Sequence, residues 1–358
     1  MISWNGMIVY PSDETKFARR ALRHYVQDWG GTDRDCLVLT LMDVWPLGPQ
    51  AVEGLRVASW VPIDHKPAPP AVVQFFQRSG ARAVAMSKFG QEELQDAGLE
   101  ALYVPHGIDC DLFQPWEDRA ELRDALKIPR DAFVVGMVAN NQGTNPPRKA
   151  FPQVFQAFAA LREKHSDAFL YLHCDMRGSN QGINLAAMAR VCGIPDEAIG
   201  VTDQAKLTLG MPQDVMPCVY GAFDVLANPS YGEGFGIPIV EAQACGTPVI
   251  VTDWTSMPEL CGAGWTCAGD PWYDPGQGAF FKYPFLAEVY DAMEAAYDGA
   301  AGLRDQAREF ALQYDVEDVL REHWIPTLEA LDRPREVAPL GGNRAQRRAA
   351  AKRAKVKV

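Results

Sequence analysis

The chain has 358 residues, of which 47% are hydrophobic and 22% charged, and its formal net charge is −12 at pH 7. This length suits about two domains of ordinary soluble composition. No apolar run approaches the ~18 residues that a membrane-spanning helix needs, and the first residues lack the basic-then-apolar pattern of a secretory signal. The composition therefore excludes a protein built on transmembrane helices and predicts a cytoplasmic one.

Two further features of the composition bear on partners. The eight cysteines are scattered with no Cys-x-x-Cys pair, so we interpret them as reduced core residues rather than a metal site. Seven basic and no acidic residues follow residue 343, which leaves a charge of −19 on residues 1–343. The acidic body would repel nucleic acid and anionic membranes, whereas the basic tail could attract either, contact the body, or form a solvated helix.

The first part of the chain alternates short apolar runs with helical patterns, which predicts parallel strands joined by helices. Strands are expected at 35–44, 55–63 and 81–87, and a strand end followed by a turn is expected at 101–109. Helices are expected at 72–80, 88–98 and 119–128. Gly80 should end the first of these helices, and Ser87 should cap the second.

The second part repeats this alternation from about residue 132. Strands are expected at 132–141, 168–175, 222–230 and 247–253. Helices are expected at 150–165, 182–193, 237–246, 285–298 and 302–331. We therefore predict an α/β protein with two doubly wound, Rossmann-like domains, at 1–115 and 116–331, followed by the basic tail at 332–358.

The stretch EGFGIPIVE, residues 233–241, carries the clearest chemical signal. A strand ends just before it, and a helix begins near Ile237. In the turn between them, Gly232, Gly234 and Gly236 lack side chains and so leave room for a ligand to approach the backbone. Ligands of parallel sheets bind beyond the carboxyl ends of the strands, and the free N–H groups of a helix N-terminus bind phosphate. Glu233 and Glu241 can each accept hydrogen bonds from neighbouring hydroxyls, so the pattern predicts a nucleotide-sugar site. The alternative is that both carboxylates only complement the helix dipole.

The segment AFDVLANPSYGEGFGIPIVEAQACGTPVIVTD, residues 222–253, resembles the signature of retaining, GT-B-fold glycosyltransferases of the group 1 (family 4-like) type. Their hallmark is two glutamates separated by seven residues. VPHGIDCDLF at 104–113, NPPRKAFPQVFQAF at 145–158 and AVAMSKFG at 83–90 are also similar to segments of this family. The resemblance covers about 55–331 and implies two domains facing a cleft, with a UDP- or GDP-sugar as donor.

The resemblance also implies roles for individual residues. Glu241 would bind the ribose, and Arg148 and Lys149 would neutralise the departing diphosphate, where fixed cations lower the barrier. The donor sugar and its phosphate would be held by Glu233 and by the backbone of Gly234, Phe235, Gly236 and Ile237. With two cations in that role, no metal or other cofactor is expected. Because the family retains the anomeric configuration without an obvious protein nucleophile, the two-carboxylate scheme of glycosidases does not apply to these glutamates.

The N-terminal domain should supply the acceptor site. His65 is the candidate for a histidine that faces the donor sugar in this family, with Asp64 as second choice, whereas His106 is expected to shape the junction between the domains. Only 34 residues precede the first recognisable strand, so this domain looks short by one strand–helix unit, either truncated or reduced. That departure leaves acceptor binding and activity open.

Three alternatives remain beside the glycosyltransferase. The first is a degenerate homologue that binds a nucleotide sugar without transferring it; the second is a sugar-nucleotide epimerase, which the spacing fits poorly. A Rossmann dehydrogenase is disfavoured because no Gly-x-Gly-x-x-Gly follows the first strand. The acceptor could be a protein, glycan, lipid or DNA. The tail resembles basic ends of proteins from phages of actinobacteria, which is consistent with a phage enzyme acting in the host cytoplasm.

Overall fold

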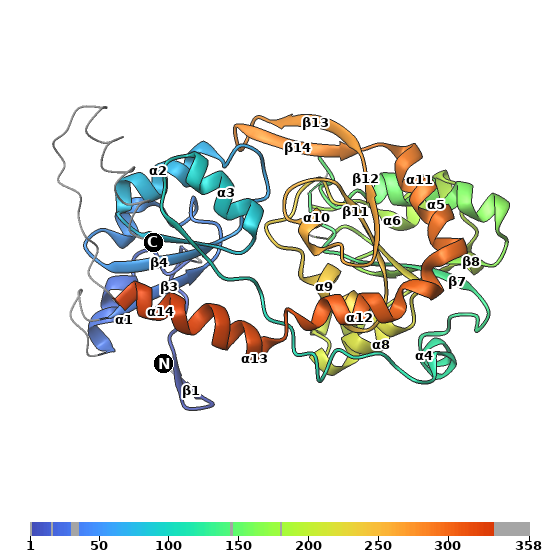
Figure 1. Ribbon diagram of the computed structural model, residues 1–358, viewed down its shortest axis with the longest axis horizontal. Coiled ribbons are helices and arrows are strands. Elements are labelled where there is room, and N and C mark those ends of the chain that lie inside the picture. The colour runs from blue at the N-terminus through green and yellow to red at the C-terminus, as the bar shows by residue number, and fades with distance from the viewer. Residues whose placement is uncertain (1, 16, 30–35, 144–145, 180, 333–358) are drawn as a thin grey trace.

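The computed structural model describes residues 2–332 apart from 16, 30–35, 144–145 and 180. Two α/β units lie side by side, each with its own parallel sheet (Figure 1). The chain passes between them twice, near residues 104–118 and 312–316. This arrangement confirms the predicted two-domain α/β fold. The basic tail lies outside the described residues, apart from Asp332.

The N-terminal unit contains a four-stranded parallel sheet. Its strands follow one another in chain order: β3 (Leu37–Leu41), β4 (Arg56–Val61), β5 (Arg82–Ala85) and β6 (Ala101–Tyr103). The connections contain a 3-10 turn η1 (Pro49–Val52) and the helices α2 (Pro70–Ser79) and α3 (Lys88–Asp96). Right-handed crossovers in a sheet of this order place all three on one face. There Phe75, Phe76 and Leu94 are buried against the sheet.

The C-terminal end of the described chain covers the opposite face of this sheet. It comprises α13 (Val316–Val319), the π-helical turn η5 (Leu320–Trp324) and α14 (Ile325–Asp332), which extend from the C-terminal unit along the N-terminal one (Figure 1). The Trp60 and Trp324 rings meet edge to face, 4.8 Å apart. Arg56 donates to the Leu331 carbonyl at 2.9 Å. Thus these helices, which the sequence analysis grouped with residues 116–331, supply the second layer of the N-terminal unit.

Segments at the start of the chain do not extend this sheet. β1 (Ile2–Trp4) and β2 (Met7–Val9) form a separate antiparallel ribbon, and α1 (Leu22–Asp28) packs near η1. Within the described residues, the first parallel strand is therefore β3. Within the same residues, the N-terminal unit has four parallel strands and the C-terminal unit has six, and the expectation of a shortened N-terminal domain stays a prediction.

The C-terminal unit contains a six-stranded parallel sheet of doubly wound order, β12-β11-β10-β7-β8-β9. Its strands are β7 (Phe133–Val138), β8 (Ala168–His173), β9 (Ile199–Val201), β10 (Val225–Asn228), β11 (Val249–Thr252) and β12 (Gly264–Cys267). The order reverses between β7 and β10, which are neighbours. Such a switch point opens a crevice at the carboxyl ends of the two strands.

Helices cover both faces of this sheet. One face carries α5 (Phe151–Lys164), α6 (Leu185–Val191) and α11 (Leu286–Gly299). The other packs against α4 (Arg119–Leu126), α8 (Met216–Gly221), α9 (Ile237–Ala244) and α12 (Arg304–Leu312). The predicted caps are present: Ser87 accepts from the Gly90 amide at 3.0 Å, and Gly80 adopts a left-handed conformation. The helix expected over 302–331 is instead broken after α12, where Asp315 caps α13.

The sequence analysis missed a long hairpin between β12 and α11. Its strands β13 (Gly269–Asp274) and β14 (Ala279–Pro284) pair in antiparallel register. Figure 1 shows the hairpin spanning from the C-terminal to the N-terminal unit, on the side opposite α13.

In the described part of the chain, no helix is both long and apolar enough to cross a membrane.

The docking of α14 gives a test of the fold. Leu331 is 4% exposed and belongs to the main hydrophobic cluster, whereas Leu328 on the same helix is 43% exposed. We expect Leu331→Ala to lower the free energy of unfolding by about 2–5 kcal/mol, and Leu328→Ala to change it by about 0.5 kcal/mol or less. Denaturant unfolding of both variants measures this difference. Equal effects would contradict the docking.

Candidate active site at the switch point

The two cations predicted to bind phosphate lie at the carboxyl end of β7. Arg148 and Lys149 precede α5, and Ala150 adopts a left-handed conformation (φ 55°) that turns the chain into this helix. Glu233 follows the neighbouring strand β10, and the Tyr231 amide donates to the Arg148 carbonyl at 2.8 Å. The switch point therefore brings Glu233 next to Arg148 and Lys149, which lie 85 and 84 positions earlier in the chain.

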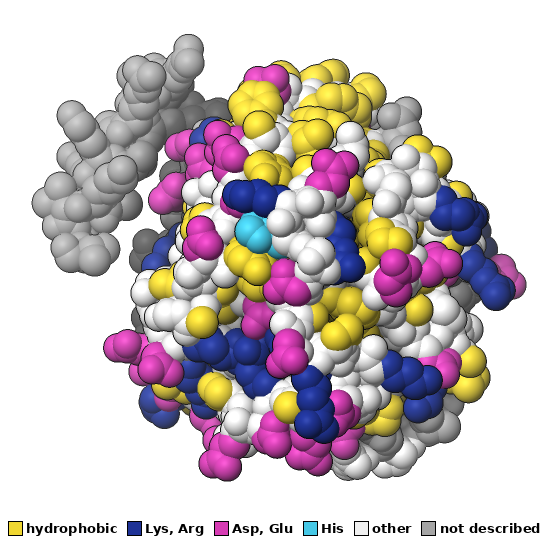
Figure 2. All heavy atoms as spheres, turned by 90° about the vertical axis from the view of Figure 1, so that its right-hand side faces the viewer, with side chains coloured by type: hydrophobic (Ala, Val, Ile, Leu, Met, Phe, Trp, Pro, Cys, Tyr) yellow, Lys and Arg dark blue, Asp and Glu magenta, His cyan; other side chains and the backbone are white. Residues whose placement is uncertain are grey.

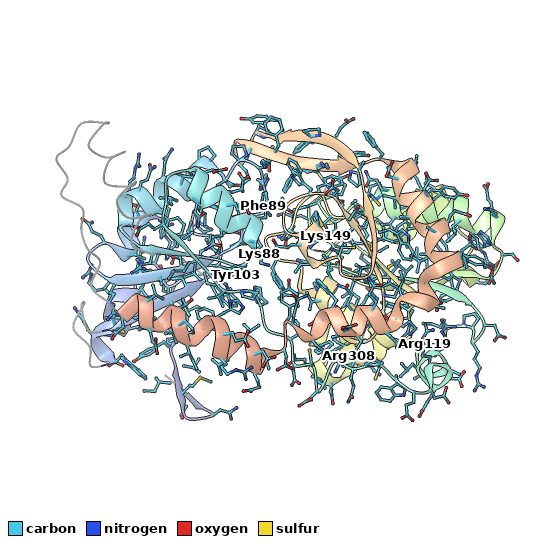
Figure 3. The ribbon with its side chains drawn as sticks, viewed as in Figure 1. Lys88, Phe89, Tyr103, Arg119, Lys149 and Arg308 are labelled. Carbon is cyan, nitrogen blue, oxygen red and sulfur yellow. The ribbon has the colours of Figure 1, made fainter. Side chains whose placement is uncertain are left out.

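The three side chains form a buried ion cluster. Arg148 Nη1 lies 3.1 Å from Glu233 Oε2, and Lys149 Nζ bonds to Glu233 Oε1. Glu233 is 7% exposed. Figure 3 places Lys149 on the side of the C-terminal unit that faces the N-terminal unit. The cluster thus lies between the two units, as expected for a cleft site in this fold.

The cluster fixes the charge of Glu233. Burial would raise the pKa of this carboxyl, but Lys149 and Arg148 outweigh it and lower the pKa to about 2. Burial also lowers the pKa of Lys149, whereas for Arg148 the attraction of Glu233 exceeds the effect of burial and raises the pKa. Glu233 is therefore ionised at neutral pH and can only accept hydrogen bonds.

The loop after β11 holds the glycine turn in place through side-chain hydrogen bonds. Thr255 Oγ1 accepts from the Glu233 amide at 3.0 Å, and Ser256 Oγ donates to the carbonyls of Glu233 and Phe235. Thr255 has φ 54°, which is rare for a β-branched residue and marks a locally strained loop. Neither residue was singled out by sequence, because only the packing of β11 beside β10 brings this loop to the turn.

Two glycines of the turn lie in close contact with the N-terminal unit. A Cβ atom at Gly232 would lie 2.1 Å from the Asp64 carbonyl oxygen, and one at Gly234 would lie 2.2 Å from Pro62 Cβ. Gly236 has φ 117°, which a larger residue would adopt only under strain. The sequence interpretation, in which these glycines leave room for a ligand, therefore needs correction for Gly232 and Gly234, which leave room for the loop after β4.

The amides at the start of α9 remain available. Within the described residues, no protein acceptor is found for the amides of Gly234, Phe235, Gly236 and Ile237. Pro238, in the first turn, has no N–H group. These amides carry the partial positive charge of the helix N-terminus, so they can bind an anion.

Glu241 lies apart from the ion cluster. It is half-buried on α9 and accepts a hydrogen bond from the Tyr220 hydroxyl of α8 at 2.6 Å. Burial raises the pKa of Glu241, although Tyr220 partly opposes this shift. The structure thus brings Glu233, Arg148 and Lys149 into contact, while Glu241 has a different partner.

His65, expected to face the donor sugar, is enclosed in this structure. It is 2% exposed, and its Nδ1 lies 2.6 Å from Asp64 Oδ1. Asp64 Oδ2 lies 3.9 Å from Arg148 Nη1, which links the histidine to the ion cluster. His106 lies between Trp60 and Phe235 at the junction of the two units, and burial lowers its pKa to about 4.

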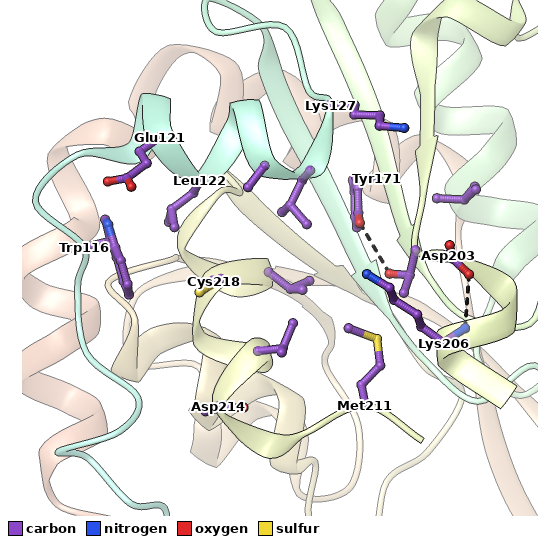
Figure 4. Close-up of a pocket in the computed structure, with 16 residues that line it drawn as sticks. Trp116, Glu121, Leu122, Lys127, Tyr171, Asp203, Lys206, Met211, Asp214 and Cys218 are labelled. Carbon is purple, nitrogen blue, oxygen red and sulfur yellow. Dashed lines mark hydrogen bonds between the residues drawn. The ribbon is translucent and has the colours of Figure 1, made fainter. Parts of the chain in front are cut away.

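A separate cavity of about 640 Å³ opens between α4, α7 (Gln204–Leu209) and α8 (Figure 4). Its wall includes the rings of Trp116 and Tyr171 and the charged side chains of Asp203 and Lys206. The Tyr171 hydroxyl lies 3.4 Å from Thr202 Oγ1. None of the ion-cluster residues lines this cavity, and the sequence analysis did not predict it.

Other surfaces carry weaker signals. Figure 2 shows acidic and basic side chains interspersed on the end of the C-terminal unit that faces away from the N-terminal unit.

In the described part of the chain, no group of three or more His, Cys, Asp or Glu is placed to hold a metal ion. The expectation that no metal takes part stays a prediction.

Comparison with known proteins shows what this fold and the region of the site are similar to. Residues 132–273, which contain the ion cluster and the turn, match the family model described as glycosyl transferases group 1. Over 250 residues, the chain is 30% identical to a D-inositol 3-phosphate glycosyltransferase of Corynebacterium jeikeium. It is 29% identical over 231 residues to the enzyme of the same name from Mycolicibacterium smegmatis.

Solved structures support the same fold. Anabaena HepE in complex with UDP and glucose has a TM-score of 0.64 at 20% identity, covering 87% of this chain and 81% of that one. A sucrose-phosphate synthase of Thermosynechococcus elongatus has a TM-score of 0.66 at 17% identity, covering 87% and 77%. The chain therefore has the two-domain fold of these structures, and its residues 132–273 are similar to group 1 glycosyl transferases.

The sequence matches cover only part of the relatives. The aligned region is 69% of this chain but 54% of the Corynebacterium enzyme, and 64% of this chain but 49% of the Mycolicibacterium enzyme. The chain thus spans about half the length of these curated relatives. The matched family region lies in the C-terminal unit.

The ion cluster predicts a pH-dependent stability. Replacing Glu233 with Gln removes the carboxylate that pairs with Lys149 and leaves Arg148 only Asp64 and the Gly232 carbonyl, which should cost about 3–5 kcal/mol at pH 7. The pKa of Glu233 lies below its ordinary value of 4.5, so its contribution is complete above that pH and is lost as the pH falls toward about 2. The free energy of unfolding should be measured at pH 7 and near pH 2. The difference in this free energy between wild type and Glu233→Gln should be smaller at the lower pH.

The exposed Glu322, which lies 3.4 Å from Arg321, provides the control. Glu322→Gln should change stability by about 1 kcal/mol or less at either pH. If Glu233→Gln were as mild at pH 7, the buried cluster would not be the interaction that holds the turn.

Proposed function

We propose that this protein transfers a sugar from a nucleotide-diphosphate sugar to an acceptor, with retention of the anomeric configuration. The observation that carries the proposal is the meeting of Glu233, Arg148 and Lys149 at the switch point beside the free amides of α9. Cations, a helix N-terminus and an ionised carboxylate together match a ligand that carries phosphates next to hydroxyls.

The comparisons support a nucleotide-sugar donor. The matched relatives are named D-inositol 3-phosphate glycosyltransferases, and HepE has been solved with UDP-glucose, with a TM-score of 0.63 to this chain. UDP- and GDP-sugars are accordingly the donors to test first. No cofactor or metal is included in the proposal, because Arg148 and Lys149 can neutralise the diphosphate.

Donor binding would exchange partners within the ion cluster. The diphosphate would take over Arg148 and Lys149 and the amides of residues 234–237. Glu233, released from its cations, would accept hydrogen bonds from the sugar hydroxyls. Because charge on the departing diphosphate grows in the transition state, cations already held in place stabilise it more than they stabilise the bound donor.

The remaining site residues complete this assignment. Glu241 would accept from the ribose hydroxyls in place of, or together with, the Tyr220 hydroxyl. His65 and Asp64 would form the wall of the site contributed by the N-terminal unit. The acceptor would attack the face from which the diphosphate leaves, so Glu233 and Glu241 would bind donor rather than act as acid and nucleophile.

The acceptor is a protein, glycan, lipid or DNA. The basic tail at 332–358 would suit a phage-encoded enzyme that modifies a virion protein or DNA. The second candidate function is nucleotide-sugar binding without transfer. The four-stranded N-terminal sheet favours it, because that unit should provide the acceptor site.

The direct experiment is calorimetric titration with UDP- and GDP-sugars, followed by an assay for slow donor hydrolysis. We expect micromolar-range binding to one donor class and measurable hydrolysis. Binding without any turnover would support the second candidate.

Glu241→Gln should weaken donor binding by about 1.5–3 kcal/mol, the range for a charge-assisted hydrogen bond. Tyr220→Phe, which keeps the carboxylate, should weaken it less, and unchanged affinity of Glu241→Gln would refute the ribose role.

The role of Lys149 has its own test. Lys149→Ala should lower kcat by more than it weakens donor binding, because its charge matters most while the diphosphate departs. Lys164→Ala, at the far end of α5, removes an exposed lysine that pairs with Glu294 and should change neither quantity. Equal losses in kcat and affinity for Lys149→Ala would indicate ground-state attraction alone.

A further inference from the structure

The β13–β14 hairpin is bonded to both units. The amides of Lys66 and Phe280 each donate to the other residue's carbonyl, at 3.0 and 2.9 Å, which pairs β14 with the loop after β4. The Lys282 amide donates to the Tyr231 carbonyl at 2.9 Å, next to the glycine turn. Main-chain bonds therefore hold the hairpin in a fixed place over the contact between the units.

One face of the hairpin closes over His65. Cross-strand partners share a face, so the register Trp272↔Phe281 and Asp274↔Ala279 places Asp274 and Phe281 on the same side. The Phe281 ring lies against the imidazole, with centroids 3.7 Å apart. Asp274 Oδ2 lies 3.4 Å from His65 Nε2. The hairpin thus supplies both the surface beneath the ring and a partner for its second nitrogen.

Asp274 is oriented by its own turn and does not depend on His65 for its position. Its Oδ1 accepts from the Gly276 amide at 2.8 Å, and its carbonyl accepts from the Gly278 amide at 2.8 Å. One carboxylate oxygen therefore closes the hairpin turn, while the other points at the imidazole. Such a group is fixed before any ligand arrives.

The two carboxylate contacts bear on how many protons the ring carries. Ionised carboxylates only accept, and a neutral imidazole has a single N–H donor. With Asp64 at Nδ1 and Asp274 at Nε2, both nitrogens must carry a proton for both contacts to be hydrogen bonds. Asp43, Arg148 and Lys149 also face this cluster, and Arg148 contacts Glu233 as well.

We propose that Asp274 is a positioning residue, which holds His65 doubly protonated and oriented so that Asp64 keeps Arg148 in place for the donor. These contacts link the hairpin through His65, Asp64 and Arg148 to Glu233. His65 and Asp64 belong to the N-terminal unit, whereas the hairpin, Arg148 and Glu233 belong to the C-terminal unit. Asp274 acts through these residues and does not touch the donor. This inference rests on the proposed function for its effect on turnover, but not for its effect on the histidine.

The test begins with the nitrogen chemical shifts of the histidine rings at pH 7 in the full chain without ligand, with His65 identified from the spectrum of His65→Gln. We expect the wild-type His65 ring to be doubly protonated. In Asp274→Asn, the amide oxygen can still close the turn, but the –NH₂ group faces Nε2 and needs an acceptor. The ring should become the neutral tautomer that keeps its proton on Nδ1.

Asp270→Asn is the matched control, because Asp270 lies on the same strand and face, is exposed, and is 4 residues away from Asp274. It should leave the His65 shifts unchanged. A second variant, Asp274→Ser, can retain a hydroxyl acceptor for the Gly276 amide if Asp274→Asn folds poorly. It should also yield a neutral ring. A neutral His65 in the wild type, or unchanged shifts in both Asp274 variants, would overturn the inference.

Turnover provides the second measurement. With the donor class found by titration, Asp274→Asn should lower kcat about tenfold with little change in KM, because it removes one charge-assisted hydrogen bond outside the donor contacts. Changed histidine shifts with unchanged kcat would refute the positioning role. If the wild type neither binds nor hydrolyses any donor, the proposed function fails, whereas the ring measurement still decides the state of His65.

Discussion

The contact of Glu233 with Arg148 and Lys149 is the interaction on which the site depends. It joins the loops after β7 and β10, the two strands between which the sheet order reverses, and it lies where the N-terminal unit meets the glycine turn. Without a ligand, each charge compensates another that would be costly to bury alone. A ligand with both phosphate and hydroxyl groups can replace these contacts one for one.

The two units are held together by more than the chain crossings. A single hydrophobic cluster includes Trp60 of the N-terminal unit, Phe223 of the C-terminal unit and Val319 of α13. The contact of the glycine turn with Pro62 and Asp64 is close enough that side chains at Gly232 and Gly234 would prevent it. The C-terminal helices thus complete a small sheet that could not otherwise bury both of its faces, and they also hold it against its neighbour.

The sequence predicted the features that local patterns encode. Buried strands, helix ends such as Gly80 and Ser87, and the Glu-x7-Glu turn all follow from spacing and residue type. The hairpin partners of His65 did not follow, because nothing within residues 58–70 indicates that a segment more than two hundred positions later will enclose them. The aromatic residues on either side of the Asp-Pro-Gly turn of 271–283 favour a hairpin, yet only the three-dimensional structure shows what its inner face meets.

The enclosure of His65 has a consequence for how a donor can reach the site. Glu233 and His65 are both buried, and the groups between them, Asp64 and Arg148, are about one third exposed. A donor would therefore first meet the exposed parts of Arg148 and Asp64, and Glu233 only after the cations have turned to the phosphate. Because Arg148 contacts both Asp64 and Glu233, phosphate binding there would replace its contact with Glu233 while Asp64 holds it from the other unit. The same arginine would thus couple donor binding in the C-terminal unit to the position of the wall that the N-terminal unit provides.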